Sequence, residues 1–404
     1  MNPWSGLGRL PRELWVLFIA TLVNRAGTMA LTFLTIYVTR GMGLTDGQAG
    51  LVFTVYGIGA IITAPLAGRL SDRAGPLLVM KLSLFFSGAV LFALPFAKTL
   101  FAILAITFLW AIVGEALRPA SMAIISDVAT PEQRKPAFAL NRLAINLGMS
   151  VGPVVGGFLA ELSFKAIFFV DGATSIAAGL ILVASRWRFA HADTAEAPAR
   201  DAAAEPPVSR FGVLKDYQFL YFLLALIPVE IVFFQSHAAM PLFLVRDLSM
   251  SPSVYGTLFA VNTVIIVLLE VPLNSAMANW PHRPTLALGS FLFGAGFGAL
   301  AFVTGFWSAA ATVVVWTFAE MILFPASSAY VADLAPPKKR GEYMGLYTMG
   351  FSVAFAVGPG IGALVYERFG GPTLWVASFV TGCVSTLMML RLRSSRAAAA
   401  SAAD

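Results

Sequence analysis

The feature that constrains this chain most is a series of twelve long apolar stretches. About twenty apolar residues cross a bilayer as a helix, and a helix satisfies its own backbone hydrogen bonds there. Only 12% of the 404 residues are charged and 58% are hydrophobic, whereas a soluble domain carries about 25% charged residues. We therefore predict an all-α polytopic membrane protein with transmembrane helices at 13–39, 46–70, 77–97, 100–127, 135–160, 164–186, 217–245, 252–277, 284–304, 307–333, 340–366 and 371–391.

The basic residues predict the orientation of these helices. If the N-terminus is cytoplasmic, most of the 27 Lys and Arg residues fall in cytoplasmic loops, as the positive-inside rule requires. We expect a multi-pass protein of the plasma (bacterial inner) membrane with both termini in the cytoplasm. The net charge of +6 then reflects orientation, and we expect no nucleic-acid partner.

Several classes of chemistry are disfavoured. The single cysteine, Cys383, and the three histidines leave no disulfide framework and no metal cluster. The segments "GEALRPAS" and "GAGFGAL" lack the strand context and GK[ST] ending of a phosphate loop. There is no nucleophile–base pair and no sizeable soluble domain. We expect neither an enzyme nor a cofactor nor a bound metal.

The two halves of the chain are copies of one another. "RPASMAIISDVATPEQR" (118–134) aligns with "FPASSAYVADLAPPKKR" (324–340), and "GPVVGG" (152–157) aligns with "GPGIGA" (358–363), both at a shift of 206 residues. Parallel six-helix repeats of this kind predict a substrate site near the bilayer midplane. We expect an N-terminal bundle (1–186), a cytoplasmic linker (187–213), a C-terminal bundle (214–393) and a disordered cytoplasmic tail (394–404).

Three motifs resemble the major facilitator superfamily. "GRLSDRAG" (68–75) is similar to that superfamily's loop between helices 2 and 3, and "PASMAIISDVATPEQR" is similar to the end of helix 4 and its following loop. "GMSVGPVVGG" (148–157) is similar to the fifth-helix motif of the twelve-helix drug:proton antiporters. The resemblance implies the major facilitator fold, with two pseudo-symmetric six-helix bundles, and secondary active transport by alternating access. One position differs: Trp110 stands where many such antiporters carry an arginine.

The resemblance also assigns roles to two groups of residues. A gating latch at the cytoplasmic ends of the helices would use Gly68, Asp72, Arg73 and Gly75, with Arg73 paired to Asp127 and Asp72 near the start of helix 11. A simple orientation signal would account for the arginines alone. The fifth-helix motif comprises Gly148, Gly152, Pro153, Gly156 and Gly157. Small residues allow close helix packing, and the resemblance adds a hinge that stops proton leakage.

Ionisable residues within the membrane are the proton-coupling candidates. Placing a charged side chain in the bilayer is energetically unfavourable, so such residues usually have a function. Glu320 and Glu230 lead, since a carboxylate that alternates between a cation and apolar surroundings binds and releases a proton in each cycle. A fixed structural carboxylate is the alternative for both. Glu115 and Arg118 are also candidates, and their spacing of three predicts a local ion pair on one helix face.

The remaining candidates would line a substrate cavity. In members of this superfamily certain helices line the central cavity. The polar and aromatic candidates on these helices are Arg25, Asn24, Tyr56, Phe233, Phe234, Asn262 and Trp316. An aromatic cavity suits lipophilic substrates, although most such side chains in membrane proteins contact lipid or neighbouring helices.

Two transport functions follow. The first is proton-coupled export of small lipophilic or amphipathic compounds, as in multidrug efflux. The alternative is a proton-coupled carrier for a dedicated anionic or zwitterionic substrate (peptide, sugar conjugate, siderophore or lysolipid), clamped by Arg25 and Arg118. In both cases the expected partners are a small-molecule substrate, protons and the lipid bilayer, and we expect the monomer to be functional.

Overall fold

The computed structural model of the chain describes residues 10–130, 133–187, 213–277, 279–336 and 339–392. Most of the predicted linker and all of the predicted tail lie outside the described residues. Within them, eleven helices are long and apolar enough to cross a membrane. They become twelve if Asp46–Thr63 and Pro65–Ala74, which meet at a 42° bend, count as one span. The prediction of an all-helical membrane protein with about twelve spans is confirmed.

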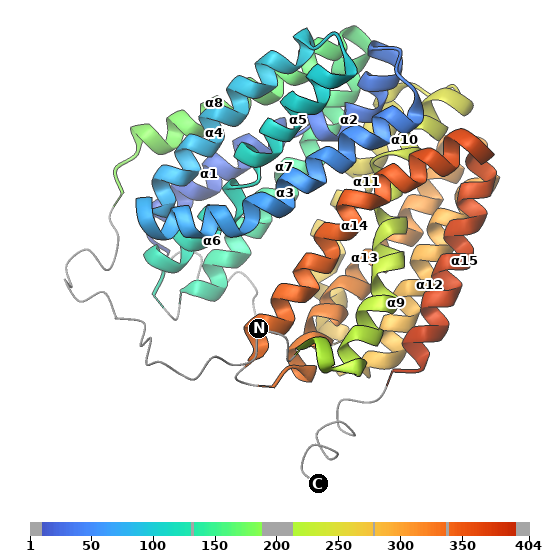
Figure 1. The fold of residues 1–404 in the computed structure, drawn as a ribbon. Helices are drawn as coiled ribbons and strands as arrows, with labels where there is room; N and C mark the ends of the chain where they lie inside the picture. Colours follow the sequence, from blue (N-terminus) through green and yellow to red (C-terminus); the bar gives the residue numbers. More distant parts are fainter. Residues whose placement is uncertain (1–9, 131–132, 188–212, 278, 337–338, 393–404) are drawn as a thin grey trace. The chain divides into compact units, whose positions relative to one another are not determined.

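The helices follow the predicted order (Figure 1). Their bounds are α1 (Arg12–Gly27), α2 (Ala30–Ile36), α3 (Asp46–Ala74), α4 (Pro76–Ala93), α5 (Leu100–Gly114), α6 (Leu117–Val128), α7 (Arg134–Leu162), α8 (Phe164–Ala184), α9 (Tyr217–Phe233), α10 (Ala239–Leu242), α11 (Pro252–Ala276), α12 (His282–Gly298), α13 (Phe306–Leu334), α14 (Arg340–Phe369) and α15 (Gly371–Leu390).

Three of the predicted spans contain interruptions, although each is still one candidate membrane span: Arg12–Gly41, Leu100–Val128 and Tyr217–Asp247. The first breaks between α1 and α2, the fourth between α5 and α6, and the seventh between α9 and α10. The first and seventh also end in matching π-helical turns, Tyr37–Gly41 and Phe243–Asp247. Apolar periodicity does not reveal such interruptions, because they depend on partners from other helices.

The described chain forms two compact units by contact. Among the described residues, unit 1 takes those within 10–44, 55–187 and 251–263, and unit 2 takes those within 45–54, 213–250 and 264–392. The start of α3 thus packs with the C-terminal repeat, and the start of α11 packs with the N-terminal repeat. The predicted boundaries divide the chain once, at the linker. By contact, however, residues 45–54 belong with the C-terminal repeat and residues 251–263 with the N-terminal repeat.

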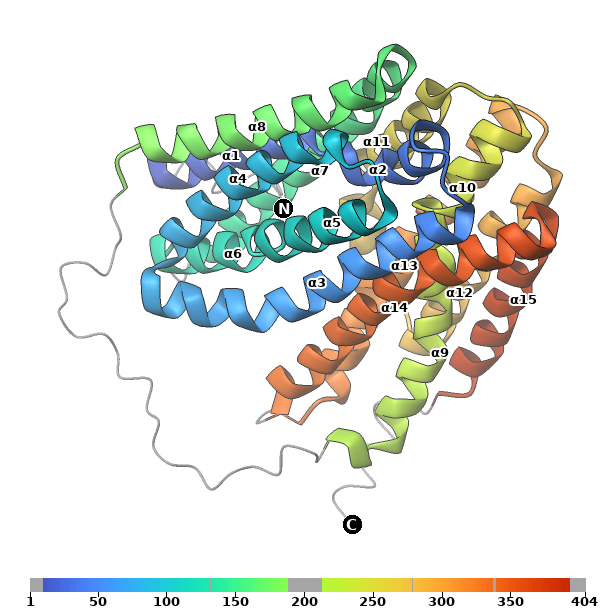
Figure 2. The ribbon, with the colours of Figure 1, turned by 45° about the horizontal axis from the view of Figure 1, so that its top comes forward.

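The same packing plan recurs in each unit. In unit 1, α1 packs against α7 and α8, and α4 packs against α8 (Figure 2). In unit 2, α9 packs against α14 and α15, and α12 packs against α15. Corresponding helices begin 206 residues apart, as Pro76 of α4 and His282 of α12 do. The sequence repeat is therefore also a structural repeat.

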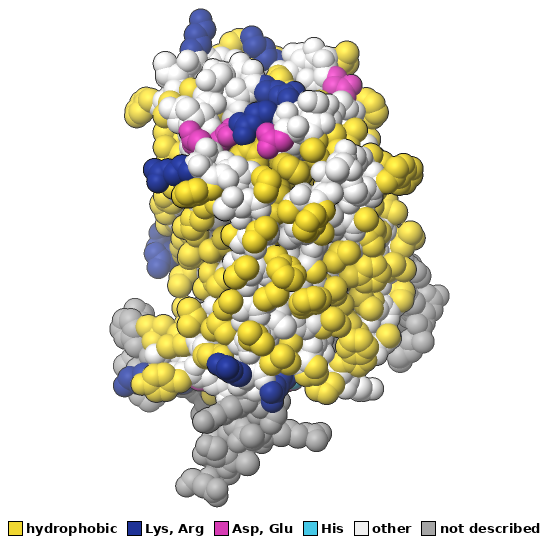
Figure 3. All heavy atoms as spheres, turned by 90° about the vertical axis from the view of Figure 1, so that its right-hand side faces the viewer, with side chains coloured by type: hydrophobic (Ala, Val, Ile, Leu, Met, Phe, Trp, Pro, Cys, Tyr) yellow, Lys and Arg dark blue, Asp and Glu magenta, His cyan; other side chains and the backbone are white. Residues whose placement is uncertain are grey.

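The surface that includes α15 is apolar. Figure 3 shows a broad hydrophobic area on this face, with charged side chains gathered towards its two ends. On α15, Val376, Val380, Val384 and Leu387 are all more than half exposed. A contiguous apolar surface of this kind on a helical bundle is the expected surface towards lipid.

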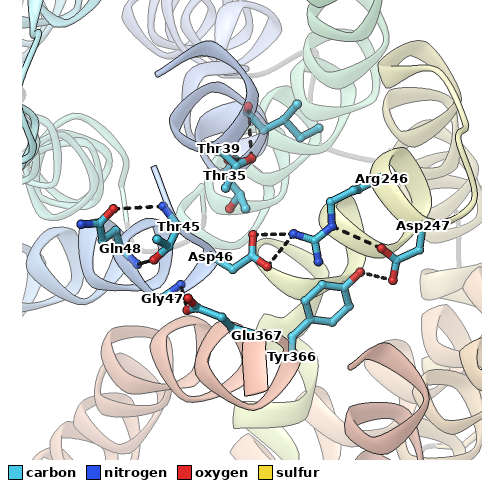
Figure 4. A network of polar contacts seen from close by, with 11 residues as sticks. Thr35, Thr39, Thr45, Asp46, Gly47, Gln48, Arg246, Asp247, Tyr366 and Glu367 are labelled. Atoms are coloured by element: carbon cyan, nitrogen blue, oxygen red, sulfur yellow. Dashed lines mark hydrogen bonds and ion pairs between the residues drawn. The ribbon is translucent and has the colours of Figure 1, made fainter. Parts of the chain in front are cut away.

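The start of α3 is fixed by a polar network within unit 2 (Figure 4). Arg246 Nη1 donates to both carboxylate oxygens of Asp46, at 2.9 and 2.6 Å, and Arg246 Nε lies 3.2 Å from Asp247 Oδ1. The Tyr366 hydroxyl donates to Asp247, and the Arg246 guanidinium lies 5.0 Å from the Tyr366 ring centroid. Four side chains thus converge on one helix N-terminus.

A glutamate caps the start of α3, and a second glutamate caps the start of α11. In unit 2, Glu367 Oε2 accepts a hydrogen bond from the Gly47 amide at 2.6 Å. In unit 1, Glu161 Oε1 accepts one from the Ser253 amide at 3.3 Å. Both the glutamates and the capped amides are separated by the repeat distance of 206 residues. Each carboxylate satisfies an amide that has no partner within its own helix, and it complements the positive end of the helix dipole.

Candidate functional site

Unit 1 contains a polar cavity of about 250 Å³. Five of the predicted site residues line it: Asn24, Arg25, Tyr56, Glu115 and Arg118. They come from α1, α3, the α5–α6 break and α6, which are far apart in sequence. Sequence reasoning did not select Ser87 and Ser175 as lining residues, because single serines in apolar helices carry no distinctive signal.

A buried carboxylate produces the break between α1 and α2. Asp171 of α8 is 3% exposed, and its Oδ2 accepts hydrogen bonds from the Met29 amide at 3.1 Å and the Ala30 amide at 2.9 Å. These are the first amides of α2, which have no partner within the helix. Arg25 therefore lies in the last turn of α1, where a cation is favoured, and its side chain lines the cavity.

The predicted ion pair between Glu115 and Arg118 is wrong. Glu115 Oε1 instead accepts a hydrogen bond at 2.7 Å from the Tyr56 hydroxyl, and no described contact joins the glutamate to Arg118. The reason is local: α5 ends at Gly114 and α6 begins at Leu117. The two residues are thus not on one continuous helix face, as the spacing rule assumes.

The two arginines of the cavity have unused donors. Arg25 Nε is buried without a hydrogen-bond partner, and Arg118 is exposed, with no hydrogen bond to an acceptor among the described residues. A second cavity of about 20 Å³, large enough for a single water, shares Arg25, Leu117 and Arg118 with the first. Arg25 and Arg118 therefore border both small cavities, and neither forms a hydrogen-bonded ion pair with a described carboxylate.

Trp110, at the position where the antiporters carry arginine, lines the same cavity as Arg118. Its indole Nε1 donates to Ser87 Oγ at 3.1 Å, and its ring meets Tyr56 edge-on at 5.0 Å between centroids. The cavity thus combines an aromatic wall with cationic groups, and Arg118 supplies a guanidinium to the space that Trp110 borders.

The fifth-helix motif packs against the end of α1. A Cβ atom added to Gly148 would overlap the Arg25 side chain, and one added to Gly152 would lie 2.8 Å from the Thr28 carbonyl oxygen. Gly156 has similarly little space beside Met29, at 2.7 Å. Pro153 lies within the continuous helix α7. Close packing by these small residues holds the backbone that carries Arg25.

The last glycine of the motif contacts α11. A Cβ at Gly157 would lie 2.6 Å from Ser253 Cα, and Pro153 presents its carbonyl oxygen to Gly256 in very close approach. The motif therefore fits α7 against both α1 and the start of α11 within unit 1. The predicted packing role has a direct structural basis, while the hinge role stays a prediction.

Unit 2 holds a cluster of aromatic side chains. Phe233 contacts Phe234, Phe293, Trp316 and Phe324, with ring centroids 5.1 to 6.3 Å apart. The predicted cavity residues Phe233, Phe234 and Trp316 are thus brought together, but they are packed on one another. Trp316 Nε1 is buried and has no hydrogen-bond partner.

Glu230 precedes this cluster by one turn of α9. Its side chain is 0% exposed, and neither carboxylate oxygen has a hydrogen-bond partner. Glu320, the other leading carboxylate, is half-buried and interacts with a neighbour. Glu230 is therefore the more unusual of the two, because buried polar groups are normally paired.

The remaining predicted residues are placed as follows. Asn262 is buried on α11 in unit 1 and does not line the cavity. Gly75 adopts φ = 83°, a conformation that favours glycine, and borders a shallow cavity with Asp127. Arg73 is exposed. The latch formed by Gly68, Asp72 and Arg73 stays a prediction for another state of the transport cycle.

The sequence profile of the Major Facilitator Superfamily matches residues 17–243 and 231–403. The chain belongs to the major facilitator superfamily. It is a secondary transporter and not an enzyme. Among solved structures of similar fold are a mutant of the peptide transporter POT in complex with alafosfalin and a mutant of the nucleoside transporter NupG. Their TM-scores are 0.76 and 0.79 at 18% and 13% identity. The alignments cover 96% and 94% of this chain, and 95% and 99% of those chains.

Three curated relatives of this superfamily member each align with more than four-fifths of the chain. The MFS-type transporter YqjV of Bacillus subtilis is 25% identical over 95% of this chain and 92% of its own. A Na(+), Li(+), K(+)/H(+) antiporter of Planococcus maritimus is 26% identical, over 88% of this chain and 90% of its own. Multidrug resistance protein 2 of Bacillus subtilis is 24% identical, over 81% and 82%.

Proposed function

We propose that this transporter is a proton-coupled antiporter that exports small lipophilic or amphipathic compounds. Glu230 carries the proposal. An ionised carboxylate that is fully buried without a partner is strongly destabilised, so such a group is held in its neutral form. If the surroundings of Glu230 become wet or cationic in another state, the same group releases its proton, which is the requirement for coupling.

The relatives support the direction and the substrate type. One is named as a cation/proton antiporter and another as a multidrug resistance protein. The aromatic cluster beside Glu230 suits apolar compounds. We further propose that both termini are cytoplasmic, on the basis of the distribution of Lys and Arg.

The test is transport by the purified chain in proteoliposomes that carry an imposed proton gradient. We expect gradient-driven movement of a lipophilic dye in the wild type, and none above protein-free liposomes in Glu230→Gln. The amide resembles the protonated carboxyl, so exchange of dye across the membrane without a gradient persists in this variant. The matched control is Glu13→Gln at the start of α1, which retains full activity. Gradient-driven transport in Glu230→Gln at the wild-type rate contradicts the assignment.

A carrier for a dedicated anionic or zwitterionic substrate is the second candidate. The two guanidiniums without acceptors in the unit 1 cavity favour it. Thermal-shift screening separates the two candidates. Stabilisation by a single anion class, without any response to lipophilic cations, favours the dedicated carrier. Stabilisation by many unrelated lipophilic compounds favours the exporter.

A further inference from the structure

We propose that the unit 1 cavity is a carboxylate-binding subsite, so that the transported compounds include organic anions with a small aromatic or aliphatic group next to the acid. This inference rests on the proposed proton-coupled transport, in either of its two candidate forms, and specifies the chemistry of the substrate. The site is formed by Arg25 and Arg118, with Tyr56 and Trp110 as its aromatic wall.

The argument begins with the balance of donors and acceptors. The lining contains two guanidiniums and two carboxylates, Glu115 and Asp171. Each carboxylate already accepts hydrogen bonds: Glu115 accepts from Tyr56, and Asp171 accepts from two backbone amides. Neither guanidinium donates to a described acceptor. The cavity therefore presents two guanidiniums whose donors are available to the oxygen acceptors of a ligand.

The geometry of the guanidinium donors favours a carboxylate ligand. A guanidinium presents parallel N–H donors that fit the two oxygens of a carboxylate, and such charge-assisted pairs are stronger than neutral hydrogen bonds. Arg25 is fixed in the last turn of α1 by the Asp171 cap and by the close approach of Gly148 and Gly152. Its position is thus organised before a ligand arrives, which reduces the cost of binding.

The size of the cavity limits what fits. At about 250 Å³ it is smaller than most sites that enclose drug-sized ligands, which occupy about 300–1,000 Å³. It accommodates the acid and one small apolar group rather than a whole drug-like molecule. The rings of Tyr56 and Trp110, with Leu31, Leu84 and Leu117, supply apolar surface for that group.

The test is a binding measurement on the purified full chain in detergent, by isothermal titration with benzoate, benzamide, benzylamine and inorganic phosphate. We expect saturable binding of benzoate and none of the other three. Charge-assisted hydrogen bonds are worth about tenfold or more in affinity, so Arg25→Gln and Arg118→Gln each weaken benzoate binding by at least about that factor. Arg12→Gln, which removes an exposed arginine at the start of the same helix α1, leaves it unchanged.

Several outcomes overturn the inference. They are equal affinity for benzoate and benzamide, binding of phosphate but not benzoate, and wild-type benzoate affinity in both arginine variants. Thermal unfolding of each variant identifies misfolded protein, and Arg118→Lys, which keeps the charge, provides a second folded variant with intermediate affinity. Dye export is measured separately. If export depends on Glu230 while benzoate does not bind, the inference fails and the proposed function stands.

Discussion

The cavity of unit 1 and the aromatic cluster of unit 2 occupy equivalent places in the two repeats, yet their chemistry is opposite. At a shift of 206 residues, Trp110 corresponds to Trp316, Ser87 to Phe293 and Arg118 to Phe324. The indole of Trp110 donates to Ser87, whereas the indole of Trp316 contacts Phe233 and Phe297 and has no acceptor. One backbone plan thus supports a polar space in one repeat and a packed apolar core in the other.

An exchange that places an ionisable residue in the apolar repeat is the most instructive. Asn24 of the polar repeat corresponds to Glu230 of the apolar repeat. Asn24 donates to Ser175 at 3.1 Å, while Glu230 has no partner. The ionisable residue is therefore located where solvation is poorest, and its polar but neutral counterpart is located where donors and acceptors abound. This contrast suggests a division of labour: unit 1 recognises charge, and unit 2 carries the proton.

The sharpest way to break this comparison is to move the carboxylate between the repeats. Glu230→Asn is expected to abolish gradient-driven transport in proteoliposomes, and adding Asn24→Glu is expected not to restore it. A glutamate at position 24 would be held ionised by the nearby Arg25, so it would not cycle its proton. Restored proton-driven transport in the double variant would show that the two positions are interchangeable and that burial at Glu230 is unimportant.

A second, smaller effect separates the glycines that support the two helix breaks. A Cβ at Gly152 would lie 2.8 Å from the Thr28 carbonyl oxygen, whereas one at Gly358 would lie 3.3 Å from Ile231 Cα. We expect Gly152→Ala to destabilise the protein by about 1–3 kcal/mol, as overpacking does, and Gly358→Ala to cost less. Unfolding midpoints in detergent measure the difference. Replacing glycine by alanine raises helix propensity equally in both variants. Equal unfolding midpoints would therefore mean that Gly152 is packed no more closely against the α1 break than Gly358 is against α9.

The smallest expected difference concerns the two tryptophans. Trp110→Phe removes a hydrogen bond that Trp316→Phe does not, since only Trp110 has an acceptor. A net hydrogen bond is worth about 1 kcal/mol, so Trp110→Phe should be the more destabilising by roughly that amount. Paired denaturation curves provide the measurement. If Trp316→Phe lowered the free energy of unfolding more than Trp110→Phe, the aromatic cluster would depend on a contact of the Trp316 indole beyond those described.

Much of the fold was predictable because long apolar stretches have few alternatives in a membrane. The predicted spans agree with the helices to within a few residues, and five predicted residues converge on one cavity. The interruptions were not predictable, because the amides of Met29 and Ala30 find their acceptor on Asp171, more than 140 residues away. The Glu115–Arg118 pair failed for a related reason, since the spacing rule presumes an unbroken helix.

We did not predict the local capping motif at the start of α3, although the sequence carries a signal for it. Thr45 and Gln48 form reciprocal hydrogen bonds between side chain and backbone at the start of α3, at 3.0 and 3.3 Å (Figure 4). The T-x-x-Q pattern is the sequence signature of this capping box. No local pattern, however, indicates that the same helix start receives Glu367 and Arg246 from the other repeat.

The exchange of helix starts has a consequence for the order of biosynthesis. Asp46 leaves the ribosome 200 residues before Arg246, a delay of roughly 10–40 seconds at ordinary rates of translation. During that interval the first turns of α3 lack the partners that neutralise and cap them. The start of α11 has no such delay, because the residues of the N-terminal repeat that it contacts have already been made. The nascent chain is therefore most vulnerable to misassembly at residues 45–54. The packing of this segment is complete only after Arg246 and Glu367 of the C-terminal repeat have been made.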